Sequence, residues 1–344
     1  MGEADQRSRP LTELELIRGL RRRRLGGAGV AVGIGDDCAV LEPTPGTRLV
    51  VTTDLLLEDV HFRRRWAGPA DIGWKSLAVN LSDIAAMGGQ PRWVLVALAC
   101  PPGTTAADAD AFYTAALGLA DEHGVALVGG DTSLSPAGWL VNVTLLGEAV
   151  TPLLRAGARA GDVIAVTGDL GASAAGLAVL EHPEMASRLD AAARDEVSRR
   201  HLRPAARVKE GRWLAAAGGV TAMIDLSDGL TKDLGHVLDE SGGGAEVRVD
   251  HLPVAAATRA AAAALGADAL AWATGGGEDY ELLLTCAATQ WPGLADGLAR
   301  ATGTRLTAIG RVVAGPPGLR LVDAAGAVVP ATPGFEHFAA GRAR

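Results

Sequence analysis

Apolar residues recur along the chain at two spacings, one typical of helices and one typical of strands. From residue 71 to 87 they follow a helical spacing, and Gly88, Gly89 and Pro91 end the predicted helix. Further helices are expected at 11–17, at 105–123 and from just after Asp228 to about 240. Short apolar runs predict strands at 49–54, 93–99, 125–128, 139–146, 163–167, 223–225 and 281–285. This alternation in both halves of the chain predicts two related α/β units.

A stretch rich in Gly, Ala and Arg separates the two halves. It runs from Arg155 to Asp162, and the next strand opens the second unit. The expected domains are therefore 1–150 and 151–344.

Composition narrows the class of protein. The 344 residues are 48% hydrophobic and 21% charged, which excludes a fibrous or disordered protein. A net charge of −8 argues against nucleic acid as a partner. The cysteines Cys38, Cys100 and Cys286 form no C-x-x-C pair, so a disulfide framework and a zinc site are not indicated and a reducing cytoplasm is favoured. The polar residues 1–10 and the short apolar runs predict no membrane segment.

Acidic residues follow glycines or predicted strand ends at several places. They stand at 36–37, 54, 131, 225–228 and 278–279. Carboxylates with nearby hydroxyls are hard oxygen ligands, which suit Mg²⁺ and its bound phosphates. The alternative is a set of solvated acids in turns, and the pattern alone leaves both open.

The predicted helix at 71–87 has an unusual polar face. Ser76, Asn80 and Asp83 lie on one stripe where an exposed helix would carry Lys and Glu, so Asp83 is a further candidate ligand. The alternative is a helix edge that is merely polar. Lys75 follows a glycine pattern that approaches a P-loop, but Trp74 interrupts the pattern and no strand precedes it.

Other local features leave their roles open. Gly168, Gly171 and Gly176 enter an Ala-rich helix whose first amides could hold phosphate. The basic run 21–24 is either a solvated face or a contact for nucleotide phosphate. No nucleophile elbow or zinc-protease motif is present. Phosphoryl transfer fits the many carboxylates best, because its demands are alignment and charge neutralisation.

Taken in order, the motifs resemble those of the thiamine-monophosphate kinase family, in the superfamily of aminoimidazole ribonucleotide synthetase. The resemblance covers nearly the whole chain and rests on GIGDDCA at 33–39, TTD at 52–54 with His61, AVNLSD at 78–83, GGDT at 129–132, IDLSDGL at 224–230, GGEDYEL at 276–282 and GFEHF at 334–338.

The resemblance implies transfer of the ATP γ-phosphate to thiamine monophosphate by direct in-line attack, in thiamine diphosphate biosynthesis. Several Mg²⁺ ions would assist and no protein base is implied, because a monoester phosphate is largely ionised near neutral pH. The implied Mg²⁺ ligands are Asp36, Asp37, Thr52, Thr53, Asp54, Asp83, Asp131, Asp225 and Asp228. The implied ATP contacts are Gly130, Asp131, Arg155 and Ser227. The implied thiamine phosphate contacts are His61, Glu278 and Phe335.

For architecture, the resemblance implies a two-domain α/β fold. Its N-terminal domain would bind ATP and Mg²⁺ and form a homodimer through its sheet, and its C-terminal domain would complete the site. Two superfamily rivals, a hydrogenase maturation carbamoyl dehydratase and a selenophosphate synthetase, would need a reactive cysteine at a C-terminus or in a mobile N-terminal segment. Neither fits the positions of the three cysteines. A non-catalytic sensor of Mg-ATP is a further alternative, which the retained His61 and Glu278 disfavour.

Overall fold

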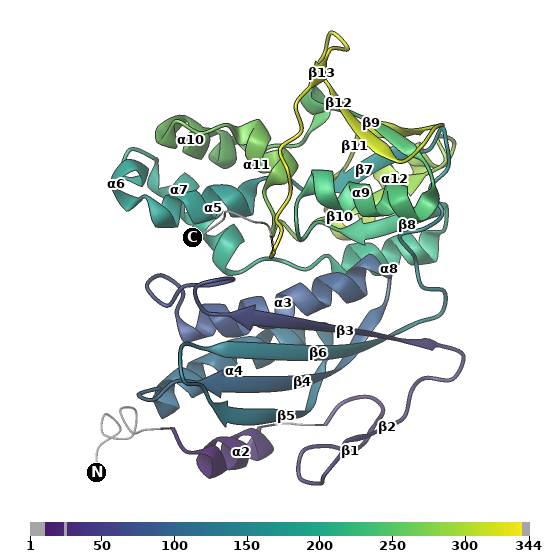
Figure 1. Cartoon of the computed structure of the whole chain (residues 1–344). Coiled ribbons are helices and arrows are strands. Elements are labelled where there is room, and N and C mark those ends of the chain that lie inside the picture. Colours follow the sequence, from purple (N-terminus) through teal and green to yellow (C-terminus); the bar gives the residue numbers. More distant parts are fainter. Residues whose placement is uncertain (1–10, 24–25, 339–344) are drawn as a thin grey trace. The chain divides into compact units, whose positions relative to one another are not determined.

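The computed structural model of the chain describes residues 11–23 and 26–338. The chain divides into two compact units (Figure 1). Unit 1 contains the residues up to 84 together with 89–152, and unit 2 contains 85–88 together with 153–344. Each unit is an α/β structure with a sheet of its own, as the alternating pattern predicted.

The main sheet of unit 1 has four strands in the order β3-β6-β4-β5. Its strands are β3 (Arg48–Leu57), β6 (Leu140–Ala149), β4 (Gln90–Cys100) and β5 (Ala126–Leu134). Strand β6 pairs antiparallel with β3 and β4, whereas β5 pairs parallel with β4. Beside this sheet, the unit has α2 (Glu13–Arg22) and a small antiparallel pair, β1 (Val30–Val32) with β2 (Val40–Leu41).

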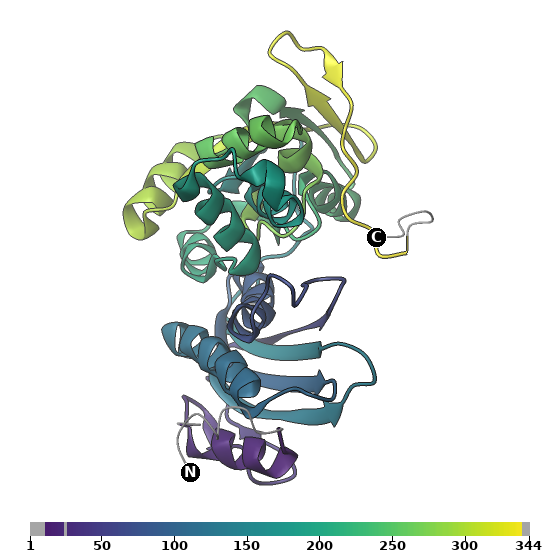
Figure 2. The ribbon, with the colours of Figure 1, turned by 90° about the vertical axis from the view of Figure 1, so that its left-hand side faces the viewer.

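Two long helices cover one face of this sheet, namely α3 (Pro69–Ala86) and α4 (Ala106–His123). Figure 2 shows both on the same side of the strands, and Leu77 of α3, Phe112 of α4 and Val94 of β4 line one small apolar space. The other face is partly covered, because Val30 of β1 and Leu41 of β2 pack against Trp93, Ala126 and Val128, and it is exposed at β3. Strand β3 shows the difference, since Val50 is 6% exposed and its neighbour Val51 is 62% exposed.

Unit 2 is built on a seven-stranded sheet in the order β13-β12-β9-β11-β7-β10-β8. The strands are β7 (Val163–Thr167), β8 (Val220–Asp225), β9 (Gly244–Arg248), β10 (Leu282–Cys286), β11 (Leu306–Val313), β12 (Gly318–Val322) and β13 (Val328–Val329). Neighbouring strands are antiparallel except for the parallel pair β9 and β12.

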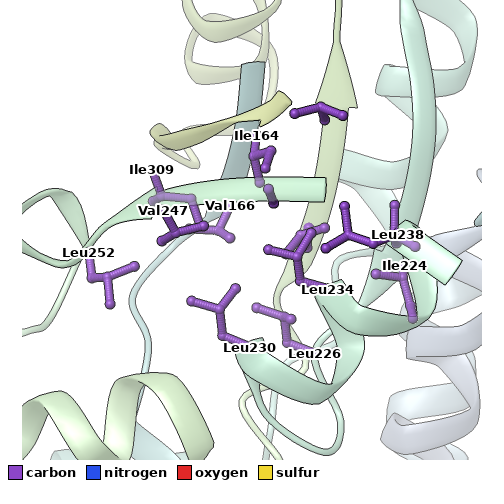
Figure 3. Packing of buried hydrophobic residues seen from close by; sticks show 14 of the residues in the cluster. Ile164, Val166, Ile224, Leu226, Leu230, Leu234, Leu238, Val247, Leu252 and Ile309 are labelled. Atoms are coloured by element: carbon purple, nitrogen blue, oxygen red, sulfur yellow. The ribbon is translucent and has the colours of Figure 1, made fainter. Parts of the chain in front are cut away.

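The helices of unit 2 are α5 (Ala172–Glu181), α6 (Pro183–Ala186), α7 (Ala191–Leu202), α8 (Val208–Ala217), α9 (Leu230–Ser241), the 3₁₀ helix η1 (Val249–His251), α10 (Ala256–Leu265), α11 (Ala269–Gly275) and α12 (Trp291–Thr302). Helix α9 places Leu230, Leu234 and Leu238 four residues apart on one face, where they belong to the buried cluster around Ile164 and Ile224 (Figure 3). This packing fixes the loop between β8 and α9, which carries Ser227 and Asp228.

Two predicted strand ends are wrong. Strand β3 continues to Leu57, so Thr52, Thr53 and Asp54 lie inside the strand rather than at its end. Strand β5 continues to Leu134 and includes Asp131. In both cases pairing with the neighbouring strand extends the element beyond the run of apolar residues that predicted it.

Candidate functional site

A cluster of oxygen ligands lies between β3 and α3 in unit 1. Thr52 and Asp54 alternate with Thr53 along the strand and so point to the same face as the buried Val50. Thr52 Oγ1 donates a hydrogen bond to Asp83 Oδ2 on α3. Burial, and secondarily the charge of Asp83, raise the pKa of Asp54 to about 7. Two carboxylates held near one hydroxyl therefore form the kind of site that a hard divalent cation would complete.

The other two members of the predicted polar stripe have structural roles. Ser76 and Asn80 are 1% and 0% exposed, and each bonds to the backbone of its own helix. Ser76 Oγ donates to the Ile72 carbonyl at 2.7 Å and Asn80 Nδ2 donates to the Ser76 carbonyl at 3.0 Å. Asp83 is therefore the member of the stripe that reaches β3.

Thr53 lies on the opposite face of β3 from Thr52. Its hydroxyl donates to the Val143 carbonyl at 3.1 Å and accepts a hydrogen bond from Asn142 Nδ2 at 3.1 Å. The side chains of Thr52 and Thr53 cannot approach the same ion, because successive side chains of a strand point to opposite faces.

Asp131 is separated from Asp54 across the sheet. Its register partner on β4 is Ala97, that of Ala97 on β6 is Asn142, and that of Asn142 on β3 is Leu55. Three strand spacings amount to roughly 14 Å. Gly130 precedes Asp131 on β5 with its φ at 156°, and a Cβ there would lie 2.0 Å from the Val96 carbonyl oxygen, so this position requires glycine.

The Asp36–Asp37 turn is exposed. Asp36 Oδ1 accepts a hydrogen bond from the Asp37 amide at 2.9 Å. The guanidinium of Arg21 lies against Gly35, where a Cβ would be 2.7 Å from the Arg21 Nη2 atom. The structure thus places one arginine of the basic run beside this turn, and Arg24 lies outside the described residues.

His61 follows the end of β3 and is held by the backbone. Its Nδ1 atom accepts a hydrogen bond from the Leu57 amide at 3.0 Å, and its own amide donates to the Leu57 carbonyl at 2.9 Å. The buried ammonium of Lys75 donates to the His61 carbonyl at 3.1 Å. Lys75 therefore supports the His61 turn.

In unit 2, three motifs far apart in the sequence meet. The Glu278 amide donates to the Ser227 carbonyl at 2.7 Å, and the Phe335 amide donates to the Asp228 carbonyl at 2.9 Å. Lys232 Nζ joins the first and third segments, lying 2.8 Å from Asp228 Oδ2 and 2.8 Å from the Phe335 carbonyl oxygen. The predicted contacts Ser227, Asp228, Glu278 and Phe335 are therefore brought together.

Two further residues of unit 2 were predicted as ligands or contacts, namely Asp225 and Arg155. Asp225 ends β8 and is 3% exposed, and Arg155 is exposed in the segment before β7. Asp233, which the sequence did not single out, accepts hydrogen bonds from the Asp228 and Gly229 amides at 3.0 Å. Burial raises its pKa to about 7.

The backbone amides at the start of α5 donate hydrogen bonds to a carboxylate of the chain itself. Asp279 accepts from the Gly171 amide at 2.6 Å and from the Ser173 amide at 3.1 Å, and burial raises its pKa to about 7. Because these amides already bind a carboxylate, the possibility that this helix end holds phosphate is not supported.

A buried ion pair forms at Glu281, which follows Asp279 by two residues. Glu281 is 1% exposed and accepts from Arg207 Nε at 2.6 Å and from Thr167 Oγ1 at 2.7 Å. Sequence analysis missed Arg207 and Lys232, since neither stands in a motif.

Within the described ranges, no three His, Cys, Asp or Glu side chains gather into a preformed metal site. Over the same residues, no helix is long and apolar enough to cross a membrane.

The chain belongs to the AIR synthase related family, because the model of its N-terminal domain matches residues 35–149 and that of its C-terminal domain matches residues 159–321.

Within this family, the chain is a member of the thiamine-monophosphate kinases. The enzyme of Salmonella typhimurium is 39% identical over 329 residues, which cover 95% of this chain and 98% of that one. The crystal structure of thiamine-monophosphate kinase from Stenotrophomonas maltophilia is 39% identical with a TM-score of 0.79, covering 91% and 97% of the two chains. AaThiL complexed with AMPPCP and TMP is 32% identical with a TM-score of 0.75, covering 94% and 96%. The family and the fold predicted from the motifs are thus confirmed.

Proposed function

We propose that this chain transfers the γ-phosphate of ATP to thiamine monophosphate, which gives thiamine diphosphate and ADP. The observation that carries the proposal is the convergence of Ser227, Asp228, Glu278 and Phe335 in unit 2 of a chain from this family. A relative of this family binds AMPPCP and TMP.

The attacking group in this reaction is a phosphate oxygen. Because the second pKa of a phosphate monoester is about 6, this oxygen is already ionised near neutral pH and needs no protein base. The chain's residues instead bind and align the two phosphates. Glu278 would accept a hydrogen bond from the amine-bearing, cationic thiamine group, and Phe335 would pack against one of its rings. Ser227, Gly130 and Arg155 would contact ATP.

The obstacle to the reaction is repulsion between two anions. Unit charges about 4 Å apart repel by about 4 kcal/mol at an effective dielectric constant of ~20. Bound Mg²⁺ would neutralise this charge. Asp54 and Asp83 with Thr52 would hold it in unit 1, and Asp225 and Asp228 would hold it in unit 2. The roles of Asp36, Asp37, Thr53 and Asp131 as further ligands, and of His61 as a substrate contact, remain predictions.

The reaction can be tested by ³¹P NMR of the protein with Mg-ATP and thiamine monophosphate, beside a control with unphosphorylated thiamine. We expect a diphosphate ester to form together with ADP in the first sample alone. Intact ATP, or ATP hydrolysis that is independent of the acceptor, would contradict the proposal.

The exposed face of β3 in the unit 1 sheet is the proposed homodimer contact. Leu49, Val51 and Leu55 are 49%, 62% and 47% exposed on one face of β3, which is an apolar surface that a second copy would cover. Sedimentation should show a dimer, and Val51→Asp should dissociate it. Val328→Asp is the control, since Val328 is also 62% exposed but lies in unit 2. A monomeric wild-type protein would contradict this contact.

The proposed location is the cytoplasm. Cys38, Cys100 and Cys286 are all free thiols, which suits a reducing compartment.

A further inference from the structure

Glu278 is held in a backbone conformation that L-residues rarely adopt. Its φ is 65°, and that of Tyr280, two residues later, is 51°. Such conformations persist where surrounding contacts determine them, and they cluster at ligand sites. Here the Glu278 amide bonds to Ser227, the Tyr280 amide bonds to the Leu226 carbonyl at 2.9 Å, and the Asp279 carboxylate between them is held by the first amides of α5. The backbone of Glu278 is therefore fixed from both sides.

A buried histidine also reaches the carboxylate of Glu278. His201 lies on α7 and is 4% exposed. Its Nδ1 atom is 3.3 Å from Glu278 Oε2 and 3.0 Å from Ser173 Oγ. The Glu278 side chain remains 26% exposed, so a part of it stays accessible while one oxygen faces the imidazole.

The contact between His201 and Glu278 indicates which ring nitrogen of the imidazole carries a proton. An ionised carboxylate can only accept hydrogen bonds, so an attractive contact requires a proton on His201 Nδ1. Ser173 Oγ can then accept from the same N–H group. The imidazole thus holds one oxygen of the Glu278 carboxylate, and the side chain is still partly accessible to a ligand.

A glycine on α5 permits the close approach of α7. A Cβ at Gly176 would lie 2.1 Å from the Val197 carbonyl oxygen and 2.9 Å from His201 Cβ. Because Gly176 follows Ser173 by three residues on α5, the same helix face meets both the backbone and the imidazole of α7. This packing explains Gly176, which entered the sequence analysis only as a possible part of a phosphate loop.

We propose that His201 is a positioning residue that orients the Glu278 carboxylate toward the cationic, amine-bearing part of thiamine monophosphate. The inference rests on the proposed function. His201 does not touch the substrate; it acts through the Glu278 carboxylate, which it contacts. Its loss should therefore weaken binding of thiamine monophosphate and leave binding of ATP unchanged.

The test compares variants that keep, move or remove the donor. In His201→Asn the side-chain amide replaces Nδ1, in His201→Gln it replaces Nε2, and in His201→Leu the donor is absent. We expect the KM for thiamine monophosphate to rise about tenfold in the Leu and Gln variants and at most about threefold in the Asn variant, which corresponds to about 1.4 kcal/mol per tenfold. The KM for ATP should stay within about twofold of the wild-type value in all three.

A double-mutant cycle separates positioning from a general structural role. In the Glu278→Gln background, His201→Leu should change the KM for thiamine monophosphate by less than about twofold, because the carboxylate it orients is gone. Thr258→Val is the matched control, since Thr258 is buried on α10, which packs against α5 and α7. It should leave both KM values unchanged.

Each other outcome overturns the proposal. Additive effects in the cycle, or a Gln variant equal to the Asn variant, would show that His201 does not act through Nδ1 on Glu278. The Asn and Gln variants keep a polar side chain, so their comparison holds even if the Leu variant fails to fold. A wild-type protein that forms no thiamine diphosphate would overturn the proposed function together with this inference, whereas an active protein with an additive cycle would overturn the inference alone.

Discussion

Glu281 in unit 2 and Asp54 in unit 1 are acids in contrasting surroundings. In unit 2, the Glu281 carboxylate is 1% exposed and is met by Arg207, with Arg200 Nη1 at 3.7 Å. In unit 1, the two causes that shift the pKa of Asp54 are burial and the charge of Asp83, and both raise it. The comparison separates an acid whose charge the protein balances itself from one whose charge a bound cation would balance in the proposed reaction.

The largest effect should come from the acids of unit 1. We expect Asp54→Ala and Asp83→Ala each to lower kcat about a thousandfold, or about 4 kcal/mol in activation free energy, because each removes a ligand for the ion that neutralises the phosphates. Initial rates with excess magnesium would measure this loss. The control is Asp121→Ala, an exposed acid of α4 in the same unit. Near-normal turnover in either site variant would remove that residue from the metal site.

The next effect should be a loss of stability in unit 2. Arg207→Met leaves the Glu281 carboxylate buried without its main partner, and we expect it to lower the free energy of unfolding by about 3 kcal/mol. Urea denaturation would measure the change. The double variant Arg207→Met with Glu281→Gln should recover most of the loss, since no buried charge remains. If the single and double variants are equally unstable, the ion pair is not the cause. Arg248→Met, which breaks an exposed pair with Asp250, should leave the midpoint unchanged.

The smallest effect concerns pH in the metal-free protein. The folded-state pKa of Asp54 is raised to about 7 from its ordinary value of 3.8, so the folded state binds the extra proton between these values. Its contribution therefore favours folding at low pH and is lost as the pH rises toward 7, by about 1 to 2 kcal/mol for a partly exposed group. Excess magnesium should restore stability above pH 7, because it binds the ionised carboxylate.

Asp54→Asn provides the control for this pH dependence. Asp233 and Asp279 have pKa values raised to about 7 by burial as well, so they contribute a slope of the same sign in every sample. The wild-type slope minus the Asn-variant slope isolates Asp54. Equal slopes in urea denaturation between about pH 5 and pH 8 would contradict the raised pKa.

The motifs placed several candidate residues on the right elements because each motif is a local pattern with a local structural reason. Helical spacing placed Asp83 on the face of α3 that meets β3, and the short strand β8 placed Asp225 at its end. Meeting points between distant segments could not be predicted in this way. Glu281 and Arg207 are 74 residues apart, and Ser173 and His201 are 28 apart. Only tertiary packing brings such pairs together.

Strand ends were the least predictable local feature. The apolar run at 49–54 ends in a carboxylate, and a polar residue usually marks a strand end. Pairing with β6 continues through Leu57 instead, because the next residues again alternate between an exposed and a buried face. The strand position of Asp131 on β5 has the same explanation, since pairing with β4 extends past the apolar residues.

The pairing of β3 with β6 has a consequence for insertions and deletions. Ten consecutive pairs join the strands without a bulge, from Arg48 opposite Ala149 to Leu57 opposite Leu140, and β3 has no other neighbour in this sheet. A slip of one residue would exchange its faces, turning Thr53 and Leu55 toward the helices and carrying Asp54 to the open side. One residue inserted in the strand before Thr52 would thus abolish the cluster while keeping every one of its side chains in the sequence. The site therefore depends on the number of residues along β3 as much as on their identity.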